Sequence, residues 1–584
     1  MNIRKAKLFL SFKLRHFLRL IITKISGFIS IFKRMRLALG LLSIMEKRII
    51  IICTIVFLVA LGFLVRKIYL KNSYLVPAVG GKISIAEVGE PKLLNPLFAK
   101  SSEDKDVVNL VYSGLFYWDN NLVLKPDLAK KWVISEDRKT YTFALNEVNW
   151  HDNMPVTSED IAFTASVISD QQYAGPLKGL FDNVTVEPVD DKTIKFTLAE
   201  PYQPFLKRLT FGILPAHVLG NVPTDQLEED NFNLSPVGSG PYMVQKTKLI
   251  GNTKQVILER VATSKNRDSF ISEITINYFK DFEGAAKAYQ KGEVSVLTNI
   301  PVEEFKEISK NRDLNLYHLK AASYMVLFFN LTSDNLKQKS IRVAIAESIN
   351  KNAIIDEVLS GNAEPVEGPI LPGFLGYSEQ MKAVKYDFQK AEKDLAQIGF
   401  KKNDLGILTK NGKVLEFNLA LTDDEVSMAT AEKIKAQLAE VGIKANVIQA
   451  DLLTLQTDYI FNRKFDMLLF GENLGPDSDP YPFWHSSQIG TTKLNFSGFS
   501  NKEVDKLLEQ ARTTSDKKLR QKNYQRFQQI IIDDVPVIFI FRPDSLLAVN
   551  SKVKGVEENN LISSSDKLFQ LKNWYLKMGR KKNK

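Results

Sequence analysis

The sequence of 584 residues has a single cysteine, Cys53, and five histidines. One cysteine cannot form a disulfide within the chain, so the fold does not depend on an oxidising compartment. Four of the histidines stand singly and far apart in the sequence: His151, His217, His318 and His485. A zinc or nickel site would therefore need ligands assembled from distant positions. The sequence favours neither a disulfide-stabilised scaffold nor a metalloenzyme.

The familiar catalytic motifs are missing as well. There is no His-Glu-x-x-His, Gly-x-Ser-x-Gly, phosphate-binding loop or dinucleotide-binding glycine pattern. Residues 515–518 fit Ser-x-x-Lys but lie in a charged connector, where a solvated turn is the better interpretation. Residues 477–479 lack the Gly and closing Glu of a calcium-binding loop. We expect no catalytic residue, no metal and no cofactor; a hydrolase whose acid and base groups meet from distant positions stays an alternative.

Most of the chain carries no net charge of either sign. Residues 1–48 hold twelve Lys or Arg and one acid, whereas the remainder holds 66 basic and 66 acidic residues. A pI of about 9.1 would ordinarily favour a nucleic-acid partner. Because the basic excess is confined to one end, we expect no nucleic-acid partner.

One long hydrophobic run separates the basic end from the neutral remainder. Residues 49–65 contain no charged side chain and are just long enough to cross a bilayer. Lys and Arg concentrate on the cytoplasmic side of membrane proteins. We therefore expect a basic cytoplasmic head (1–48), one transmembrane helix (49–66) and a body outside the cytoplasm, attached to the cell membrane.

Two alternatives concern this N-terminal region. A cleaved signal usually has a short basic region followed by small residues, but residues 66–69 are Arg-Lys-Ile-Tyr. A lipoprotein signal would need a small residue before Cys53, and three isoleucines stand there. We favour an uncleaved anchor. Apolar residues at three- and four-residue steps over 10–32 predict a basic amphipathic helix on anionic lipid, with a poorly ordered tail as the alternative.

The body alternates predicted strands and helices, after a short tether (67–81). Strands are expected at 82–88, 139–145, 193–198, 255–260, 324–330 and 535–541. Helices are expected at 104–117, 158–168, 341–349, 429–441, 502–513 and 519–533. A mixed chain of this length predicts an α/β architecture with two or three lobes.

Several short motifs occur in a fixed order along the body. They are found at 90–97 (EPKLLNPL), 111–115 (VYSGL), 124–129, 141–143, 150–157 (WHDNMPVT), 237–242 (VGSGPY), 329–330, 341–346, 368–370, 479–480 (DP), 495–499 (NFSGF) and 504–508. This series resembles the peptide/nickel-type (family 5) extracellular solute-binding proteins of ABC importers, over about residues 82–545.

The resemblance implies a two-lobe periplasmic-binding-protein type II fold with an extra subdomain, here preceded by the transmembrane helix. The implied division is lobe I at 82–120, 237–325 and 541–584, the inserted subdomain at 121–236, and lobe II at 326–540. A ligand would be enclosed when the lobes close about a hinge.

The resemblance also implies where a ligand binds. In relatives that bind peptides, an aspartate shortly before the Asp-Pro pair meets the ligand's amino group. Here Pro476 occupies that position and Asp477 follows, so either Asp477 substitutes or this protein does not read a free amine. Trp484 offers a flat surface to a ligand or packs in lobe II. The candidate ligand-binding residues are Leu94, Tyr112, Glu472, Asn473, Asp477, Trp484 and His485.

Four other residues of these motifs are expected to be structural. His151 is predicted to stabilise a turn, and Arg342 to form an ion pair. Gly238 and Gly240 are predicted to allow positive φ near an interlobe crossing.

The sequence thus predicts a monomeric, membrane-anchored protein that captures oligopeptides and delivers them to ABC permease subunits. Within the same class, an oligosaccharide or a nickel chelate is an alternative ligand. In another class, the alternative is a surface receptor or scaffold that serves no transporter.

Overall fold

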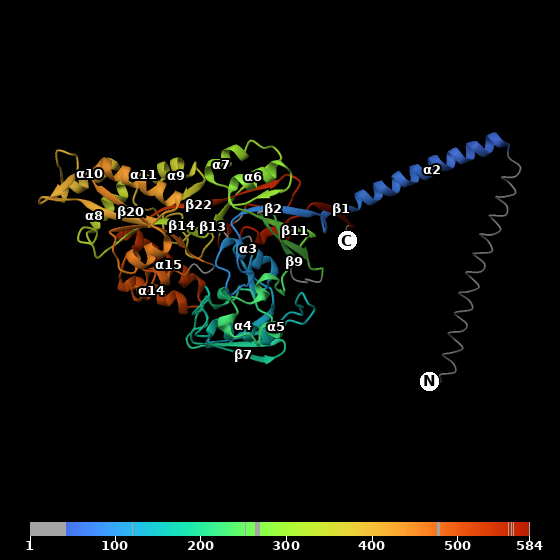
Figure 1. Ribbon diagram of the computed structural model, residues 1–584, viewed down its shortest axis with the longest axis horizontal. Helices are drawn as coiled ribbons and strands as arrows, with labels where there is room; N and C mark the ends of the chain where they lie inside the picture. Colours follow the sequence, from blue (N-terminus) through green and yellow to red (C-terminus); the bar gives the residue numbers. More distant parts are fainter. Residues whose placement is uncertain are drawn as a thin grey trace. The chain divides into compact units, whose positions relative to one another are not determined.

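Figure 1 shows the computed structural model, which describes residues 43–119, 121–251, 253–262, 269–475, 479–558, 560–561, 563 and 566–582. The chain divides into two compact units. One joins Met1–Pro77 to Met578–Lys584, and the other is Ala78–Lys577, which we call the body. Residues 1–42, including the amphipathic helix expected at 10–32, lie outside the described part of the chain.

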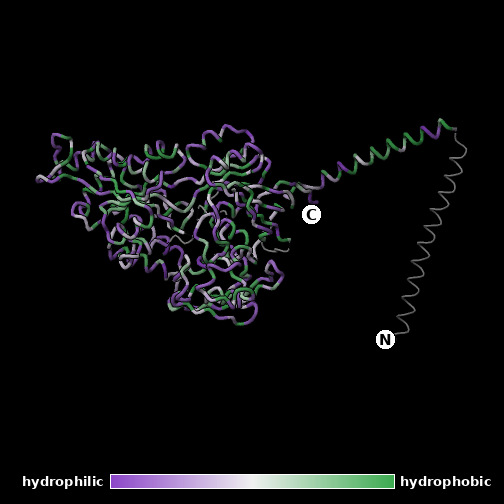
Figure 2. The backbone as a smooth tube through the Cα atoms, in the orientation of Figure 1, coloured by the Kyte–Doolittle hydropathy of each residue, from purple (hydrophilic) through white to green (hydrophobic). Residues whose placement is uncertain are grey.

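In its described part, the first unit contains one long, exposed helix, α2 (Ile44–Lys71). It begins at a capping box in which Ser43 and Glu46 each accept a hydrogen bond from the other's backbone N–H. No side chain of α2 is buried, and Figure 2 shows its apolar run in green. Among the described residues, it is the one helix long and apolar enough to cross a membrane. The cap explains why the helix begins before the expected span of 49–66.

A two-stranded ribbon follows the helix. β1 (Ser73–Ala78) pairs with β24 (Lys577–Lys582), which comes from the opposite end of the chain. Residues 67–81, expected as a short tether, therefore hold the last turn of α2 and a paired strand. A single local sequence cannot reveal this pairing, because the partner strand is so distant along the chain.

The body is organised on one mixed sheet of thirteen strands. Its main path runs β20-β19-β21-β14-β22-β12-β2-β11-β10-β9, and β13, β15 and β23 join beside it. The strands are β2 (Lys82–Val88), β9 (Tyr242–Ile250), β10 (Thr253–Arg260), β11 (Glu273–Phe279), β12 (Val296–Leu297), β13 (Leu314–Ala321), β14 (Ser323–Phe329), β15 (Ala363–Pro365), β19 (Glu416–Thr422), β20 (Lys444–Ala450), β21 (Met467–Asn473), β22 (Val537–Asn550) and β23 (Asn560–Leu561).

Helices cover both faces of this sheet at each of its two ends (Figure 1). At the end that we call lobe I, the helices are α3 (Ser102–Val111), α6 (Phe282–Gln290) and α7 (Val302–Ile308). At the other end, lobe II, they are α8 (Lys339–Ser348), α9 (Lys351–Leu359), α10 (Phe388–Gln397), α11 (Glu425–Val441), α14 (Lys502–Thr513) and α15 (Lys517–Asp534).

The sequence of β14 is almost continuously apolar because both faces of the strand are covered. Leu327 and Phe329 join the core beneath α8–α11, whereas Tyr324, Val326 and Phe328 join the core beneath α14 and α15. Successive side chains of a strand point to opposite faces, so a strand covered on both faces needs an apolar residue at every position.

A smaller antiparallel sheet lies between β2 and β9 in the sequence. Its strands are β5 (Ala129–Ile134), β6 (Thr140–Leu145), β8 (Thr193–Leu198) and β7 (Val184–Asp190), in that order across the sheet. Tyr141, Phe143 and Leu145 are buried and alternate with half-buried residues, as expected for the strand predicted at 139–145. The predicted helix at 158–168 is present as α4 (Ser158–Ser169).

Short elements complete the body. They are β3 (Phe116–Trp118) paired with β4 (Leu124–Pro126), α5 (Ala216–Leu219), the small sheet β16 (Lys401–Lys402), β17 (Leu408–Lys410) and β18 (Lys413–Val414), and the one-turn helices α12 (Leu452–Thr454) and α13 (Tyr481–Trp484).

After β22, the chain returns to lobe I and is fixed there by buried charges. Lys567 forms ion pairs with Glu87 on β2, at 2.7 Å, and with Asp106 on α3, and all three side chains are buried. Burial and the neighbouring Glu87 raise the pKa of Asp106 well above its usual range. The finer division into lobes and subdomain stays a prediction, since the body forms a single compact unit.

Candidate functional site

Two segments cross between the lobes side by side, and Arg542 joins them. β13 leads into β14 at Ala322, and β22 runs through both lobes, pairing with β14 and then with β13. The buried Arg542 donates from Nε to the Ala321 carbonyl at 2.6 Å and from Nη2 to the Lys320 carbonyl at 2.7 Å. Its Nη1 lies 3.2 Å from Glu364 Oε1. The guanidinium therefore holds both crossing strands and β15 together.

A second charged group lies on the same two strands. Asp544 Oδ2 lies 2.8 Å from His318 Nδ1, and Oδ1 pairs with Lys320. The Asp544 side chain is only 5% exposed, so these partners compensate for a carboxylate removed from water. The crossing is therefore fixed by side-chain contacts as well as by the strand ladder.

A cavity of about 380 Å³ opens in lobe II next to this crossing. Its lining includes Glu364, which also binds Arg542, together with Glu367, Tyr377, Lys382 and Gln528. The volume falls in the range of small-molecule sites. The cavity offers carboxylates, an amine and an amide to a ligand that reaches it.

Glu472 is a buried carboxyl group beside the crossing. It lies near the end of β21, opposite Tyr324 on β14. Two residues later, the Leu474 backbone N–H donates to the Ala322 carbonyl. Glu472 is 3% exposed, and its Oε1 accepts from Tyr324 Oη at 3.1 Å. Its Oε2 has no hydrogen-bond partner among the described residues.

Burial raises the pKa of Glu472 to about 8. The carboxyl group is therefore largely protonated at neutral pH in the ligand-free protein. Tyr324 Oη also lies 3.2 Å from the Pro369 carbonyl, so the phenol has two possible acceptors for one proton. A protonated Glu472 relieves that competition. A cation placed at Oε2 would instead favour the ionised carboxylate.

Asn473 and Asp477 belong to the loop that follows β21. Asn473 is exposed, and its Oδ1 accepts from the Gly475 backbone N–H at 2.9 Å, which stabilises the turn. Asp477 lies outside the described residues.

Trp484 packs in the core of lobe II. It is 2% exposed, and its ring lies 6.0–6.3 Å from the rings of Phe499, Phe527 and Phe539. Of the two interpretations that the sequence left open, the structure thus shows packing. Tyr481 and Phe483, the other two aromatic residues of α13, are only half-buried.

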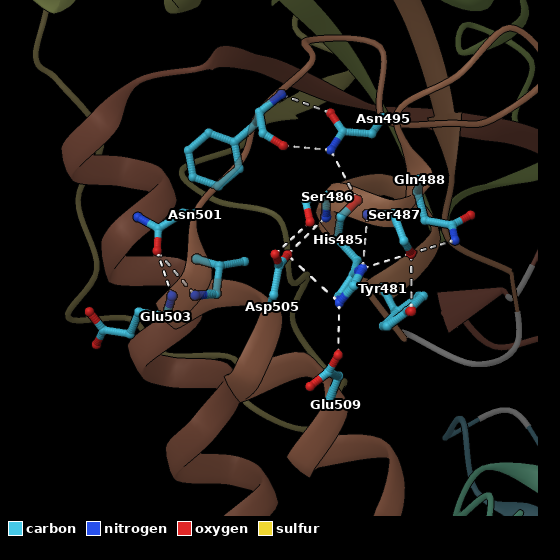
Figure 3. A network of polar contacts seen from close by, with 12 residues as sticks. Tyr481, His485, Ser486, Ser487, Gln488, Asn495, Asn501, Glu503, Asp505 and Glu509 are labelled. Carbon is cyan, nitrogen blue, oxygen red and sulfur yellow. Dashed lines mark hydrogen bonds and ion pairs between the residues drawn. The ribbon is translucent and has the colours of Figure 1, made fainter.

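His485 ties α13 to α14 through the network in Figure 3. Its Nδ1 lies 2.7 Å from Ser487 Oγ, and its Nε2 lies 3.2 Å from Glu509 Oε1. Asp505 accepts from the backbone N–H and the hydroxyl of Ser486, at 2.8 and 2.6 Å. Both ring nitrogens of His485 are therefore occupied, which indicates a positioning role for the 481–488 segment.

Arg512 connects this segment to residues 202–203, which follow β8 of the smaller sheet. Its Nε donates to Asp479 at 2.7 Å, and its guanidinium lies 3.5 Å from the Tyr481 ring centroid. The same guanidinium lies 5.7 Å from the Tyr202 ring, and the Gln203 backbone N–H donates to the Arg512 carbonyl at 2.9 Å. Sequence reasoning missed Arg512, because nothing in the last turn of a polar helix marks it.

Leu94 and Tyr112 are brought together in lobe I. Tyr112 Oη donates to the Leu94 carbonyl at 3.0 Å, and both side chains are buried in the same core. Burial raises the pKa of Tyr112 well above its usual range, so the phenol stays protonated. The pair fixes the 90–97 segment against the end of α3.

The His151 side chain joins the 150–157 segment to the 237–242 segment, and the reason given for the glycines is wrong. His151 Nδ1 accepts from the Gly238 N–H at 3.2 Å, and its Nε2 lies 3.1 Å from the Gly240 carbonyl. Neither glycine has positive φ. A Cβ on Gly238 would instead lie 2.0 Å from the Val111 carbonyl oxygen. Close packing requires these glycines.

Arg342 has the structural role that was predicted. Its side chain is buried, lies 3.1 Å from Asp534 and donates to the carbonyls of Val535 and Leu336 at 2.9 Å. Among the described residues, no group of three or more His, Cys, Asp or Glu side chains is arranged to hold a metal ion.

Comparison with known proteins identifies the family. Residues 123–493 match the bacterial extracellular solute-binding proteins, family 5 (middle region). This chain belongs to that family. The resemblance found in the sequence is therefore confirmed, and so is the mixed α/β fold of the periplasmic binding proteins.

Similar proteins cover nearly the whole body of this family member. The oligopeptide-binding protein AppA of Bacillus subtilis is 29% identical over 517 residues, which are 87% of this chain and 93% of AppA. The structure of AppA in complex with a nonapeptide matches with a TM-score of 0.69, covering 86% of this chain and 100% of AppA.

Two further solved structures are similar at comparable identity. NikZ from Campylobacter jejuni, in complex with Ni(L-His), is 28% identical, with a TM-score of 0.69 and coverage of 85% and 99%. The ABC transporter substrate-binding protein CtaP from Listeria monocytogenes is 27% identical, with a TM-score of 0.74 and the same coverage.

Proposed function

We propose that this protein captures oligopeptides outside the cytoplasm and delivers them to an ABC importer. The observation that carries the proposal is the match to AppA over most of both chains, since AppA has been solved with a nonapeptide bound. The protein would act by binding and closure, without covalent chemistry, cofactor or metal. Its partners would be the peptide and ABC permease subunits, and it would work as a monomer.

The ligand would lie between the lobes, against the crossing strands. Arg542 keeps the two crossing segments in register, so a closing motion would bend both together. Arg512 would complete closure by stacking between Tyr481 and Tyr202. A peptide main chain would be held in extended form by backbone hydrogen bonds, with roomy pockets for its side chains.

Glu472 and Asp477 would supply the negative charge that receives the peptide's amino group. Glu472 supports this role by its buried Oε2, which has no partner among the described residues. A carboxylate facing an ammonium in a site of low dielectric forms a strong, charge-assisted bond. Asn473 would add a polar contact at the rim, whereas Leu94, Tyr112, Trp484 and His485 would position the segments around the ligand.

α2 would anchor the protein in the cell membrane as an uncleaved single span. The basic residues before it favour a cytoplasmic N-terminus, which puts the body outside the cytoplasm. Anchoring would keep the binding protein close to its permease.

Native mass spectrometry of the full-length protein in detergent tests this function. The protein is incubated with a peptide mixture, with an oligosaccharide mixture and with a nickel–histidine complex. We expect short peptides of mixed sequence to be retained at one per chain. Retention of the nickel complex or an oligosaccharide without any peptide would overturn the peptide assignment and leave the solute-binding role. NikZ makes the nickel complex the informative competitor.

A further inference from the structure

The C-terminal strand β24 caps the helix α2. Arg580 Nη1 lies 3.4 Å from the Leu70 carbonyl, 3.3 Å from the Ser73 carbonyl and 3.2 Å from Ser73 Oγ. Ser73 Oγ in turn donates to the Tyr69 carbonyl at 2.5 Å. The last carbonyls of a helix have no partner within the helix, and a cation near them is favourable. The opposite end of the chain thus completes the end of α2.

This cap fits a helix that ends near lipid. Carbonyl groups away from water need protein partners, because lipid tails offer none. Arg580 and Ser73 provide those partners at the point where α2 ends. A helix ending in open water would need no such partner from the far end of the chain.

The two chain segments that form the cap are rich in basic and apolar residues and contain no acidic residue. Residues 66–78 and 577–582 contain no Asp or Glu. The basic side chains near the cap are exposed, and they are Arg66, Lys67, Lys71, Lys577, Arg580, Lys581 and Lys582. Exposed apolar side chains lie among them, with Tyr74 at 49%, Leu75 at 55% and Met578 at 48%. Aromatic, apolar and basic residues together are typical of the membrane–water interface.

We propose that the β1–β24 ribbon is a membrane-docking element that binds the anionic lipid head groups of the leaflet where α2 ends. Three features commit the ribbon to this partner: its continuity with α2, its exposed apolar side chains and its uncompensated positive charge. Lys581 and Lys582 contact the head groups, and Leu75 and Met578 enter the interface. The inference rests on the proposed membrane anchor, and it adds a second attachment at the C-terminal end of the chain.

Spin labels on the full-length protein in lipid nanodiscs test the inference. In a Cys53→Ala background, single cysteines are placed at Leu58, Leu75, Met578 and Leu405, the last being 82% exposed in the body. Collision with oxygen, which favours lipid, is compared with collision with a nickel chelate, which favours water. Nanodiscs of phosphatidylcholine alone are compared with nanodiscs that also contain phosphatidylglycerol.

The labels at 75 and 578 should show a several-fold higher oxygen-to-nickel ratio than the label at 405, and only with phosphatidylglycerol. Lys581→Glu with Lys582→Glu should abolish that rise. Lys517→Glu with Lys518→Glu, at two exposed lysines of the body, should leave it unchanged. The label at 58 should lie in lipid in every sample.

Each other outcome contradicts a specific part of the account. If the label at residue 58 lies in lipid while the labels at residues 75 and 578 behave like the label at residue 405, the ribbon does not dock and the anchor stands. If the ribbon labels enter the interface equally without phosphatidylglycerol, or if the Lys581 and Lys582 reversal has no effect, the anionic partner is wrong. If 58 is exposed to water, α2 does not span the membrane, and the anchor and this inference fail together.

Discussion

Glu472 is a buried carboxyl group at the candidate site with a raised pKa. A carboxyl group that is 3% exposed, and one of whose oxygens has no partner among the described residues, is costly to ionise, and its raised pKa expresses that cost. A protein that never placed a cation at Oε2 would be more stable with an amide or an apolar side chain there. The unfavourable burial is therefore informative about function.

Glu472→Gln should stabilise the ligand-free protein above pH 5. The folded pKa is raised from 4.5 to about 8, so the folded state binds more protons than the unfolded state between those values. The free energy of unfolding of the wild type should therefore fall as pH rises through this window, by roughly 2–4 kcal/mol, and level off outside it. Urea unfolding at pH 5 and pH 8 measures the slope, which Glu472→Gln should remove.

The same variant should bind peptide more weakly. An amide cannot neutralise an ammonium, so affinity should fall about tenfold or more. Wild-type binding at pH 7 should also release close to one proton, which calorimetry in buffers of different ionisation enthalpy detects. Glu440→Gln, at an exposed glutamate, should change neither property. A stabilised Glu472→Gln protein with unchanged affinity would make the buried carboxyl group purely structural.

At the scale of elements, the 237–242 segment is a motif that the sequence reveals, although the predicted reason for its glycines was wrong. Glycine pairs often mark positive φ, and that was the prediction. The structure shows ordinary φ values and backbone contact with the end of α3. Sequence spacing reveals that a glycine is needed, but the neighbour that excludes a side chain is distant in the chain.

Gly238→Ala should therefore destabilise the body strongly. The new Cβ would lie 2.0 Å from the Val111 carbonyl oxygen, so the segment or α3 must shift. We expect a loss of about 2–4 kcal/mol in unfolding free energy, measured by urea denaturation. Gly471→Ala is the matched control, since a Cβ there meets nothing within 4 Å. Equal effects of the two substitutions would contradict the packing explanation.

Arg512→Lys should accelerate peptide release. Lysine keeps the charge opposite Asp479 but loses the flat guanidinium that lies near both tyrosine rings. Unfolding free energy should change by less than about 1 kcal/mol, while the dissociation rate rises about three- to tenfold. Stopped-flow displacement of a labelled peptide measures the rate. Arg526→Lys, at an exposed ion pair on α15, is the control and should leave the dissociation rate unchanged. An unchanged rate in Arg512→Lys would show that Arg512 does not stabilise the closed form.

Local patterns revealed the elements better than the contacts between them. Alternation in β6 and the capping residues of α4 lie within the elements themselves, so both were predictable. The pairing of β1 with β24 and the contact of Arg512 with Tyr202 join distant segments, and no local signal encodes them. For the same reason, the sequence left open whether Trp484 contacts a ligand or packs in lobe II, because its aromatic partners come from three other segments.

At the scale of the whole molecule, one continuous sheet contributes side chains to the cores of both lobes. β22 carries lobe II side chains in its first half and lobe I side chains in its second, with Arg542 between them. A motion of the lobes must therefore act on strands that are already tied together. This arrangement favours bending at a defined place over independent movement of the lobes.

The central claim is that this family member closes on peptides, and titration calorimetry of the full-length protein with a free-amino nonapeptide tests it most directly. We predict one site per chain, with a dissociation constant of about 10 μM or tighter, and weaker binding when the peptide's amino group is acetylated. No heat with the peptide, together with saturable binding of the nickel–histidine complex, would contradict the claim.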